Sequence, residues 1–221
     1  MEMVLLILAC LFALLEAFAL WKHIPRLEYV VKPAVMVCLF AWLYLSTGMQ
    51  GMVWWFGVGI LFSLAGDILL MFIDRTFIFG LVSFLLAHSA YIIGLRAELQ
   101  ITSFWSLMLV FILGMSALRV TRRIVSAVRE KGQTRLIGPV ILYSIIITVM
   151  LYAAMLTLSN PIWKAGASVL VAVGAFLFYL SDIILAWHRF VAPISNGRLL
   201  NIACYHAGQI MLIAGVIAQF A

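Results

Sequence analysis

The stretch ILFSLAGDILLMF, residues 60–72, contains a single carboxylate, Asp67, in a run of residues that are otherwise apolar or small. A second stretch, FLFYLSDIILAW at residues 176–187, places Asp182 in the same kind of surroundings. Each run belongs to an apolar segment of about 20 residues, which is the length an α-helix needs to cross a bilayer. The two stretches therefore predict membrane-spanning helices that each carry a carboxylate among apolar neighbours.

The whole chain has the composition of an integral membrane protein. Of its 221 residues, 67% are hydrophobic and 10% are charged, and the mean hydropathy is +1.20. A soluble domain has about 45–50% apolar and about 25% charged residues. We predict an all-α fold, a polytopic membrane helix bundle with eight transmembrane helices in a single integral membrane domain, residues 1–221. The predicted spans are residues 3–20, 30–47, 52–73, 77–95, 101–120, 137–157, 165–187 and 199–220.

The distribution of Lys and Arg predicts the orientation of these spans. Of the 14 Lys and Arg residues, 12 fall in the breaks that follow the first, third, fifth and seventh spans or at the span ends that adjoin these breaks. Because cytoplasmic loops are enriched in these residues, both termini are expected outside the cytoplasm. Residues 121–136 are expected to form a solvated basic loop, with a partly helical segment on anionic lipid as the alternative. This pattern accounts for the net charge of +6 without a nucleic-acid partner.

Asp67 and Asp182 are predicted at matching depth. They precede the cytoplasmic ends of their spans by about six and five residues, which places them roughly 8–10 Å inside the hydrocarbon edge. Small residues on the same helix faces favour a position inside the bundle. A charged side chain costs roughly 2.5–3.5 kcal/mol at the bilayer centre, and helix packing does not require it. We therefore predict a functional role, the alternative being an aspartate that caps a helix or pairs with Lys32.

Further polar residues are expected in the same half of the membrane, where they could bind or orient a substrate. Residues spaced four apart on a helix share one face, as Asn201, Tyr205 and Gln209 do in the last span. For His88 alone, a hydrogen-bonded packing histidine is an equal alternative. The candidates are Lys32, His88, Tyr91, Tyr143, Asn201, Tyr205 and Gln209.

The sequence does not call for a metal or another cofactor. The three cysteines lie inside apolar runs without CxxC spacing, so neither a disulfide framework nor a zinc knuckle is expected. Compact metal motifs such as HExxH are absent. The alternative is a zinc ion held by His88, His206 and one aspartate.

Five motifs occur in order along the chain, and together they resemble the YhhN-like lysoplasmalogenase family over about residues 30 to 215. The motifs are KP at 32–33, GDILL at 66–70, FIFGLVSFLLAHSAY at 77–91, SDIILA at 181–186 and YHAGQ at 205–209. The resemblance implies an eight-helix hydrolase that cleaves the vinyl-ether bond of lysoplasmalogens, which are single-chain lysophospholipids. The products would be a fatty aldehyde and glycerophosphoethanolamine or glycerophosphocholine. It also implies a multi-pass protein of the cell membrane, which in a bacterium is the inner membrane.

Vinyl-ether cleavage is acid-catalysed, so this chemistry can be compared with the two carboxylates. Protonation of the β-carbon gives an oxocarbenium ion, and water then adds to form a hemiacetal that collapses to aldehyde and alcohol. Inverting glycosidases also pair an acid with a base around an oxocarbenium-like state. If Asp67 and Asp182 face each other, apolar surroundings would keep one proton on the pair. Lys32 and the arginines of the cytoplasmic rim could then hold the phosphate.

Two other functions fit the same residues. A proton-coupled carrier of a small solute would also place carboxylates at matched depth. A structural or receptor-like bundle would have no use for the polar cluster. Turnover by the purified protein in detergent distinguishes an enzyme from a carrier, because a carrier needs two compartments.

Overall fold

The computed structural model describes residues 2–95 and 103–221. Within them the chain is helical, and eight helices are long and apolar enough to cross a membrane, which confirms the predicted all-α bundle. The helices are α1 (Glu2–Trp21), α2 (Pro25–Thr47), α3 (Val53–Met71), α4 (Ile73–Gly94), α5 (Phe104–Glu130), α6 (Ile137–Leu156), α7 (Ala165–Ala186) and α8 (Gly197–Phe220). Short helical segments extend them: the 3₁₀ turns η1 (Thr134–Leu136) and η2 (Thr157–Ser159), and a π-helical turn η3 (Trp187–Val191). The predicted break at 96–100 and the first residues of the span 101–120 lie outside the described residues.

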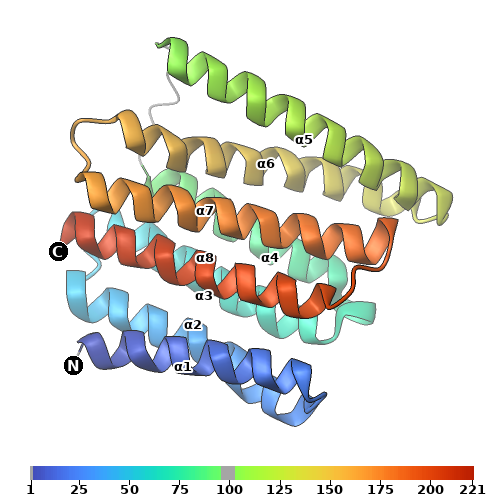
Figure 1. Ribbon diagram of the computed structural model, residues 1–221, viewed down its shortest axis with the longest axis horizontal. Coiled ribbons are helices and arrows are strands. Elements are labelled where there is room, and N and C mark those ends of the chain that lie inside the picture. The colour runs from blue at the N-terminus through green and yellow to red at the C-terminus, as the bar shows by residue number, and fades with distance from the viewer. Residues whose placement is uncertain (1, 96–102) are drawn as a thin grey trace.

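The eight helices run roughly side by side, with α1 at one edge of the bundle and α5 at the other (Figure 1). The two termini lie at one end, and the C-terminal end of α5 lies at the opposite end. Near the middle, α7 and α8 pack so closely that a Cβ on Gly174 would come within 2.5 Å of the Leu212 nitrogen. A Cβ on Gly208 would lie 2.8 Å from the Gly174 oxygen. Gly174, one of the small residues expected on the Asp182 helix, therefore allows close contact here together with Gly208 of α8.

Residues 121–136 differ from their prediction as a solvated loop. Helix α5 continues through Glu130, so most of this basic segment is helical. Its apolar residues Ile124 and Val128 are buried in a small cluster with Phe190 of η3. The charged residues of this part of α5 lie on its exposed face. Packing of the apolar face keeps the segment helical.

Local sequence signals set several helix ends. Pro25 opens α2 five residues earlier than predicted, because proline is favoured in the first helical turn, where its missing N–H is not needed. The same helix ends at Thr47, and the following Gly48 has a φ of 61° and caps the last turn. Ser103 caps α5 by accepting a hydrogen bond from the Ser106 backbone N–H.

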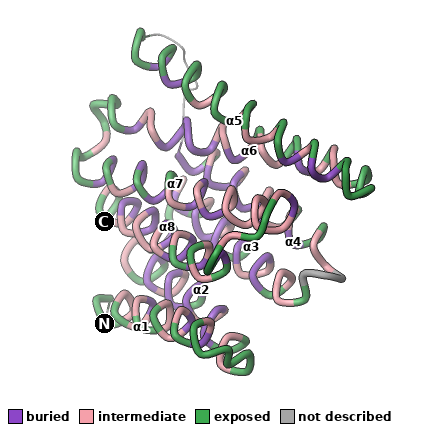
Figure 2. The backbone as a smooth tube through the Cα atoms, turned by 45° about the vertical axis from the view of Figure 1, so that its right-hand side comes forward, coloured by how far each residue is buried: buried purple, intermediate pink, exposed green. Residues whose placement is uncertain are grey.

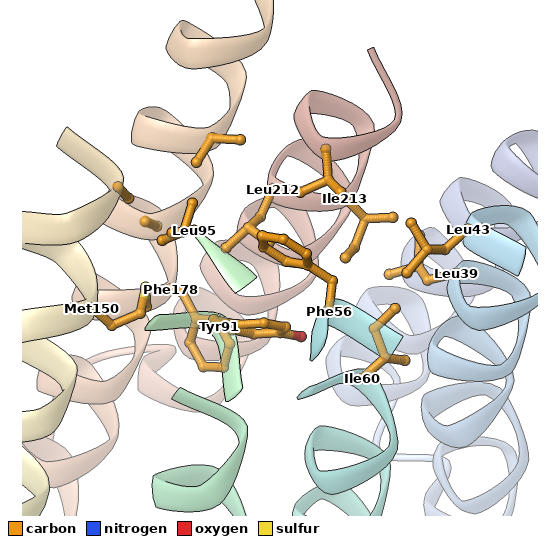
Figure 3. Packing of buried hydrophobic residues seen from close by; sticks show 14 of the residues in the cluster. Leu39, Leu43, Phe56, Ile60, Tyr91, Leu95, Met150, Phe178, Leu212 and Ile213 are labelled. Carbon is orange, nitrogen blue, oxygen red and sulfur yellow. The ribbon is translucent and has the colours of Figure 1, made fainter. Parts of the chain in front are cut away.

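The main hydrophobic core lies between α2, α3, α4, α6, α7 and α8. The Tyr91 and Phe56 rings stack there with centroids 5.9 Å apart, and Figure 3 shows them beside Ile60 and Leu212. Buried residues concentrate in this central region, whereas α5 is largely exposed (Figure 2). The smaller cluster around Ile124 is separate from this core, and the space near it forms the pocket described next.

Candidate active site

Asp182 lies where α4, α6 and α7 converge. Its Oδ2 atom accepts a hydrogen bond of 2.5 Å from the Tyr143 hydroxyl. His88 places Nε2 3.0 Å from the Tyr143 oxygen and 3.4 Å from the same Asp182 oxygen. The His88 side chain is fully buried, whereas the Asp182 side chain is 15% exposed. The three side chains therefore form one network in which the carboxylate retains an accessible side.

That accessible side faces a mostly apolar pocket at the ends of α3 to α7 and η3. Asp182 and Tyr143 supply polar atoms to its wall, and the aromatic rings of Phe77, Phe84 and Phe190 supply part of its apolar surface. The pocket is thus a place where an apolar molecule could bring a reactive group to a carboxyl group.

A groove between α5 and α6 adjoins this pocket. Thr121 of α5 and Ser144 of α6 line both spaces. From there the groove continues past Gly114 and Val149, and most of its walls are apolar. Pocket and groove together can accept a molecule with a long apolar chain.

Asp67 lies in a different environment. Its Oδ2 atom accepts a hydrogen bond of 2.7 Å from the Tyr205 hydroxyl, and Lys32 Nζ lies 3.6 Å from its Oδ1 atom. Asp67 is 1% exposed and Lys32 is 7% exposed. The alternative raised from the sequence, an aspartate that pairs with Lys32, therefore describes the surroundings of Asp67. Lys32, expected beside a phosphate, is not among the residues that line the described pocket.

Two more predicted residues extend the Asp67 side of the bundle. The Tyr91 hydroxyl donates a hydrogen bond of 2.9 Å to Gln209 Oε1. The Gln209 amide in turn donates one of 2.9 Å to the Ser63 hydroxyl. All three side chains are buried, so their polar atoms satisfy one another and hold α3, α4 and α8 together.

A buried pair that was not among the predicted site residues lies near Asp67. Glu16 of α1 and His206 of α8 approach to 2.5 Å between Oε2 and Nε2, and both side chains are almost completely buried. The only sequence signals were a glutamate near the end of an apolar span and a histidine on another face of the Tyr205 helix. Neither signal indicates that the two residues meet.

The two aspartates are in separate networks. Among the described residues, no hydrogen bond or ion pair connects the two carboxyl groups. The Phe178 ring lies between their partners, 4.6 Å from the His88 ring and 5.2 Å from the Tyr205 ring, measured between centroids. The expectation of a facing pair does not describe this arrangement. Equal depth gives no information on the direction of a side chain, and Phe178 stands one turn before Asp182 on the same face of α7.

Asn201 and the two histidines of the alternative zinc site also lie in separate places. Asn201 donates a hydrogen bond of 2.8 Å to the Ser181 carbonyl, so it ties α8 to α7 beside Asp182 without reaching the carboxylate. The two histidines of the alternative zinc site lie in different networks, His88 with Asp182 and His206 with Glu16. Within the part of the chain that the structure describes, no three His, Cys, Asp or Glu residues group closely enough to hold a metal ion.

Comparisons with known proteins agree with this architecture. The model of the YhhN family matches residues 27–216. The lysoplasmalogenase TMEM86B of Mus musculus is 25% identical over 210 residues, which cover 89% of this chain and 79% of the mouse protein. The Homo sapiens lysoplasmalogenase TMEM86B is 26% identical over 199 residues, which cover 88% and 79% of the two chains. No solved structure gives a significant match. The chain is a multi-pass membrane protein, and it belongs to the YhhN family.

Proposed function

We propose that this protein is a hydrolase that cleaves the vinyl-ether bond of lysoplasmalogens to a fatty aldehyde and a glycerophospho-alcohol. The observation that carries the proposal is the position of Asp182, a carboxyl group held by Tyr143 and His88 on the wall of an apolar pocket. The chain's relatives in mouse and human bear the name lysoplasmalogenase, which supports the same activity.

In the proposed mechanism Asp182 acts first as the acid and then as the base. Its protonated carboxyl group donates a proton to the vinyl β-carbon, and the C=C electrons form the new C–H bond. The α-carbon becomes an oxocarbenium centre, to which a water oxygen bonds while the Asp182 carboxylate takes up the water proton. The hemiacetal proton then moves to the glycerol oxygen, the C–O bond breaks, and the aldehyde C=O forms. One carboxyl group completes this cycle, so the proposal does not need a facing pair.

Tyr143 and His88 would position Asp182 for these steps. The Tyr143 hydroxyl occupies Oδ2, which leaves Oδ1 as the atom that carries the proton to the substrate. His88 contacts both Tyr143 and Asp182 through Nε2, and its ring is fully buried against Phe178. It would thereby fix the orientation of both side chains. The alkyl chain of the substrate would follow the groove between α5 and α6.

Aldehyde release from purified protein in detergent tests the proposal, with four lipids of equal chain length. We expect cleavage of the 1-alkenyl lysophospholipid. The saturated 1-alkyl lysophospholipid offers no alkene to protonate and should only compete, as should the 1-acyl form. Intact plasmalogen should react poorly, because its second chain crowds the pocket. Fatty-acid release from the acyl lipid at the rate of aldehyde release would refute the mechanism, since it would indicate ester hydrolysis.

We further propose that both termini lie outside the cytoplasm and that the protein resides in the cell membrane, in a bacterium the inner membrane. The support is the 12 of 14 Lys and Arg residues in the predicted cytoplasmic breaks or at the span ends that adjoin them. Reporter fusions at Ala221 and near Gly132 test this orientation. A cytoplasmic signal at Ala221 would refute it.

A further inference from the structure

We propose that Arg189 forms a phosphate-binding subsite at the rim of the Asp182 pocket, which anchors the headgroup of the lysophospholipid. This inference deepens the proposed function and rests on it. It also replaces the expectation that Lys32 holds the phosphate, because Lys32 is buried against Asp67.

Arg189 stands over two aromatic rings of the pocket wall. Its guanidinium carbon lies 4.6 Å from the centroid of the Phe77 ring and 5.8 Å from that of Phe190. Those two rings meet edge to face at 5.6 Å, and both line the pocket. Stacking on aromatic faces fixes the plane of a guanidinium group, and a fixed plane suits the bidentate binding of a phosphate.

The backbone around Arg189 is also unusual. The residue lies in the π-helical turn η3, which extends α7 and ends at Val191. The π-helix is a rare backbone conformation. Lys131, at the end of α5, donates a hydrogen bond of 3.0 Å to the Arg189 carbonyl. This contact fastens the turn to α5 and brings a second cation to the same rim.

The spacing of Asp182 and Arg189 along the chain is comparable to the length of the substrate segment between phosphate and vinyl ether. The two residues are seven positions apart, which is at most about 10.5 Å along the axis at the α-helical rise and less where the chain enters the π-helical turn. In a 1-alkenyl lysophospholipid, seven bonds separate the phosphorus from the vinyl β-carbon. An extended chain gains about 3.6 Å for every three bonds, so this segment spans about 8–9 Å. A phosphate held by Arg189 would therefore place the β-carbon within reach of Asp182.

The test compares two substrates with the same alkenyl chain: the lysophospholipid and the phosphate-free 1-alkenylglycerol. The measured quantity is the preference, which is the ratio of their kcat/KM values in detergent. We expect R189Q to reduce this preference about tenfold to a hundredfold, mainly through a higher KM for the phospholipid. R189K should restore part of it, because lysine keeps the charge but not the fork of donors. K131Q should have a smaller effect in the same direction.

Arg26→Gln is the matched control, because Arg26 is an exposed arginine of α2, which contributes no residue to the described pocket. Equal losses on both substrates in R189Q would overturn the inference, since a purely structural role does not change the ratio. If R189Q does not fold, R189K and K131Q carry the same comparison. Failure of the proposed function would look different: the wild type would cleave neither lipid. The subsite is then tested by binding of the uncleavable 1-alkyl lysophospholipid, and equal affinity of wild type and R189Q would overturn it.

Discussion

The Asp67 and Asp182 regions contain the same side chain near the C-terminal ends of α3 and α7, in similar local sequences, yet their surroundings differ. Asp67 has Lys32 and Tyr205 as partners and a side chain that is 2% exposed. Asp182 has Tyr143 and His88 as partners, a side chain that is 15% exposed, and a pocket beside it. A carboxylate beside a buried cation neutralises that charge and is shielded from other molecules. A carboxyl group at a pocket can exchange a proton with a bound molecule.

The largest effect is expected when the pocket carboxyl group is removed. Asp182→Asn should lower kcat by about 10²- to 10⁴-fold, the range typical of a general acid, because the amide has no proton of suitable acidity to donate. Thermal unfolding in detergent should change little, since the side chain is partly exposed and Tyr143 can still donate to the amide oxygen. Near-normal turnover would show that Asp182 is not the acid.

The same substitution at Asp67 should mainly lower the free energy of unfolding. Asp67→Asn leaves Lys32 buried without its counter-charge, and loss of one partner of a buried ion pair typically costs about 3–5 kcal/mol. Adding Lys32→Met removes the unpaired cation and should recover most of the thermal stability and of the activity. A stable but inactive double variant would show instead that Asp67 takes part in the chemistry, as first predicted from the sequence.

Two tyrosine substitutions compare the regions at the level of single hydrogen bonds. Tyr143→Phe removes the donor to Asp182 and should lower kcat about 10- to 100-fold, because a hydrogen bond to a charged group contributes about 1.5–3 kcal/mol. Tyr205→Phe removes the donor to Asp67 and should act mainly on stability. We expect a lower unfolding temperature and a smaller fold-change in kcat than for Tyr143→Phe. Steady-state rates and melting curves on both variants provide the check. The opposite assignment of effects would reverse the roles of the two regions.

The smallest effect is expected at Asn201 of α8, whose side chain donates a hydrogen bond to a backbone carbonyl of α7. Asn201→Ala removes its hydrogen bond to the Ser181 carbonyl and should cost about 1 kcal/mol of stability. The turnover rate should stay within about threefold of wild type, measured by aldehyde release. A much larger loss of kcat would indicate that Asn201 contacts the substrate.

The sequence alone determined the elements and the inventory of polar residues. Eight apolar runs of sufficient length leave no other fold in a bilayer than a helix bundle, because every backbone polar group must be paired within its own segment. The presence of a carboxylate within each of these two spans was equally visible, since an ionisable residue there is rare and costly. The loop predicted at 121–136 was wrong because its helicity depends on packing against Phe190, which is distant in the sequence.

Only the tertiary structure decided which residues meet. Depth along a helix follows from counting residues, but the direction in which a side chain points relative to other helices depends on how the helices are rotated and packed. That rotation pairs Asp67 with Lys32, places Phe178 between the two networks, and joins Glu16 to His206 across 190 positions of sequence. It also sets Asp182 and Phe190 on one pocket, and it places the Arg189 guanidinium over the Phe77 ring of the pocket wall. The sequence has no periodicity that encodes such contacts, because each arises from side-chain packing between segments that are far apart in the chain.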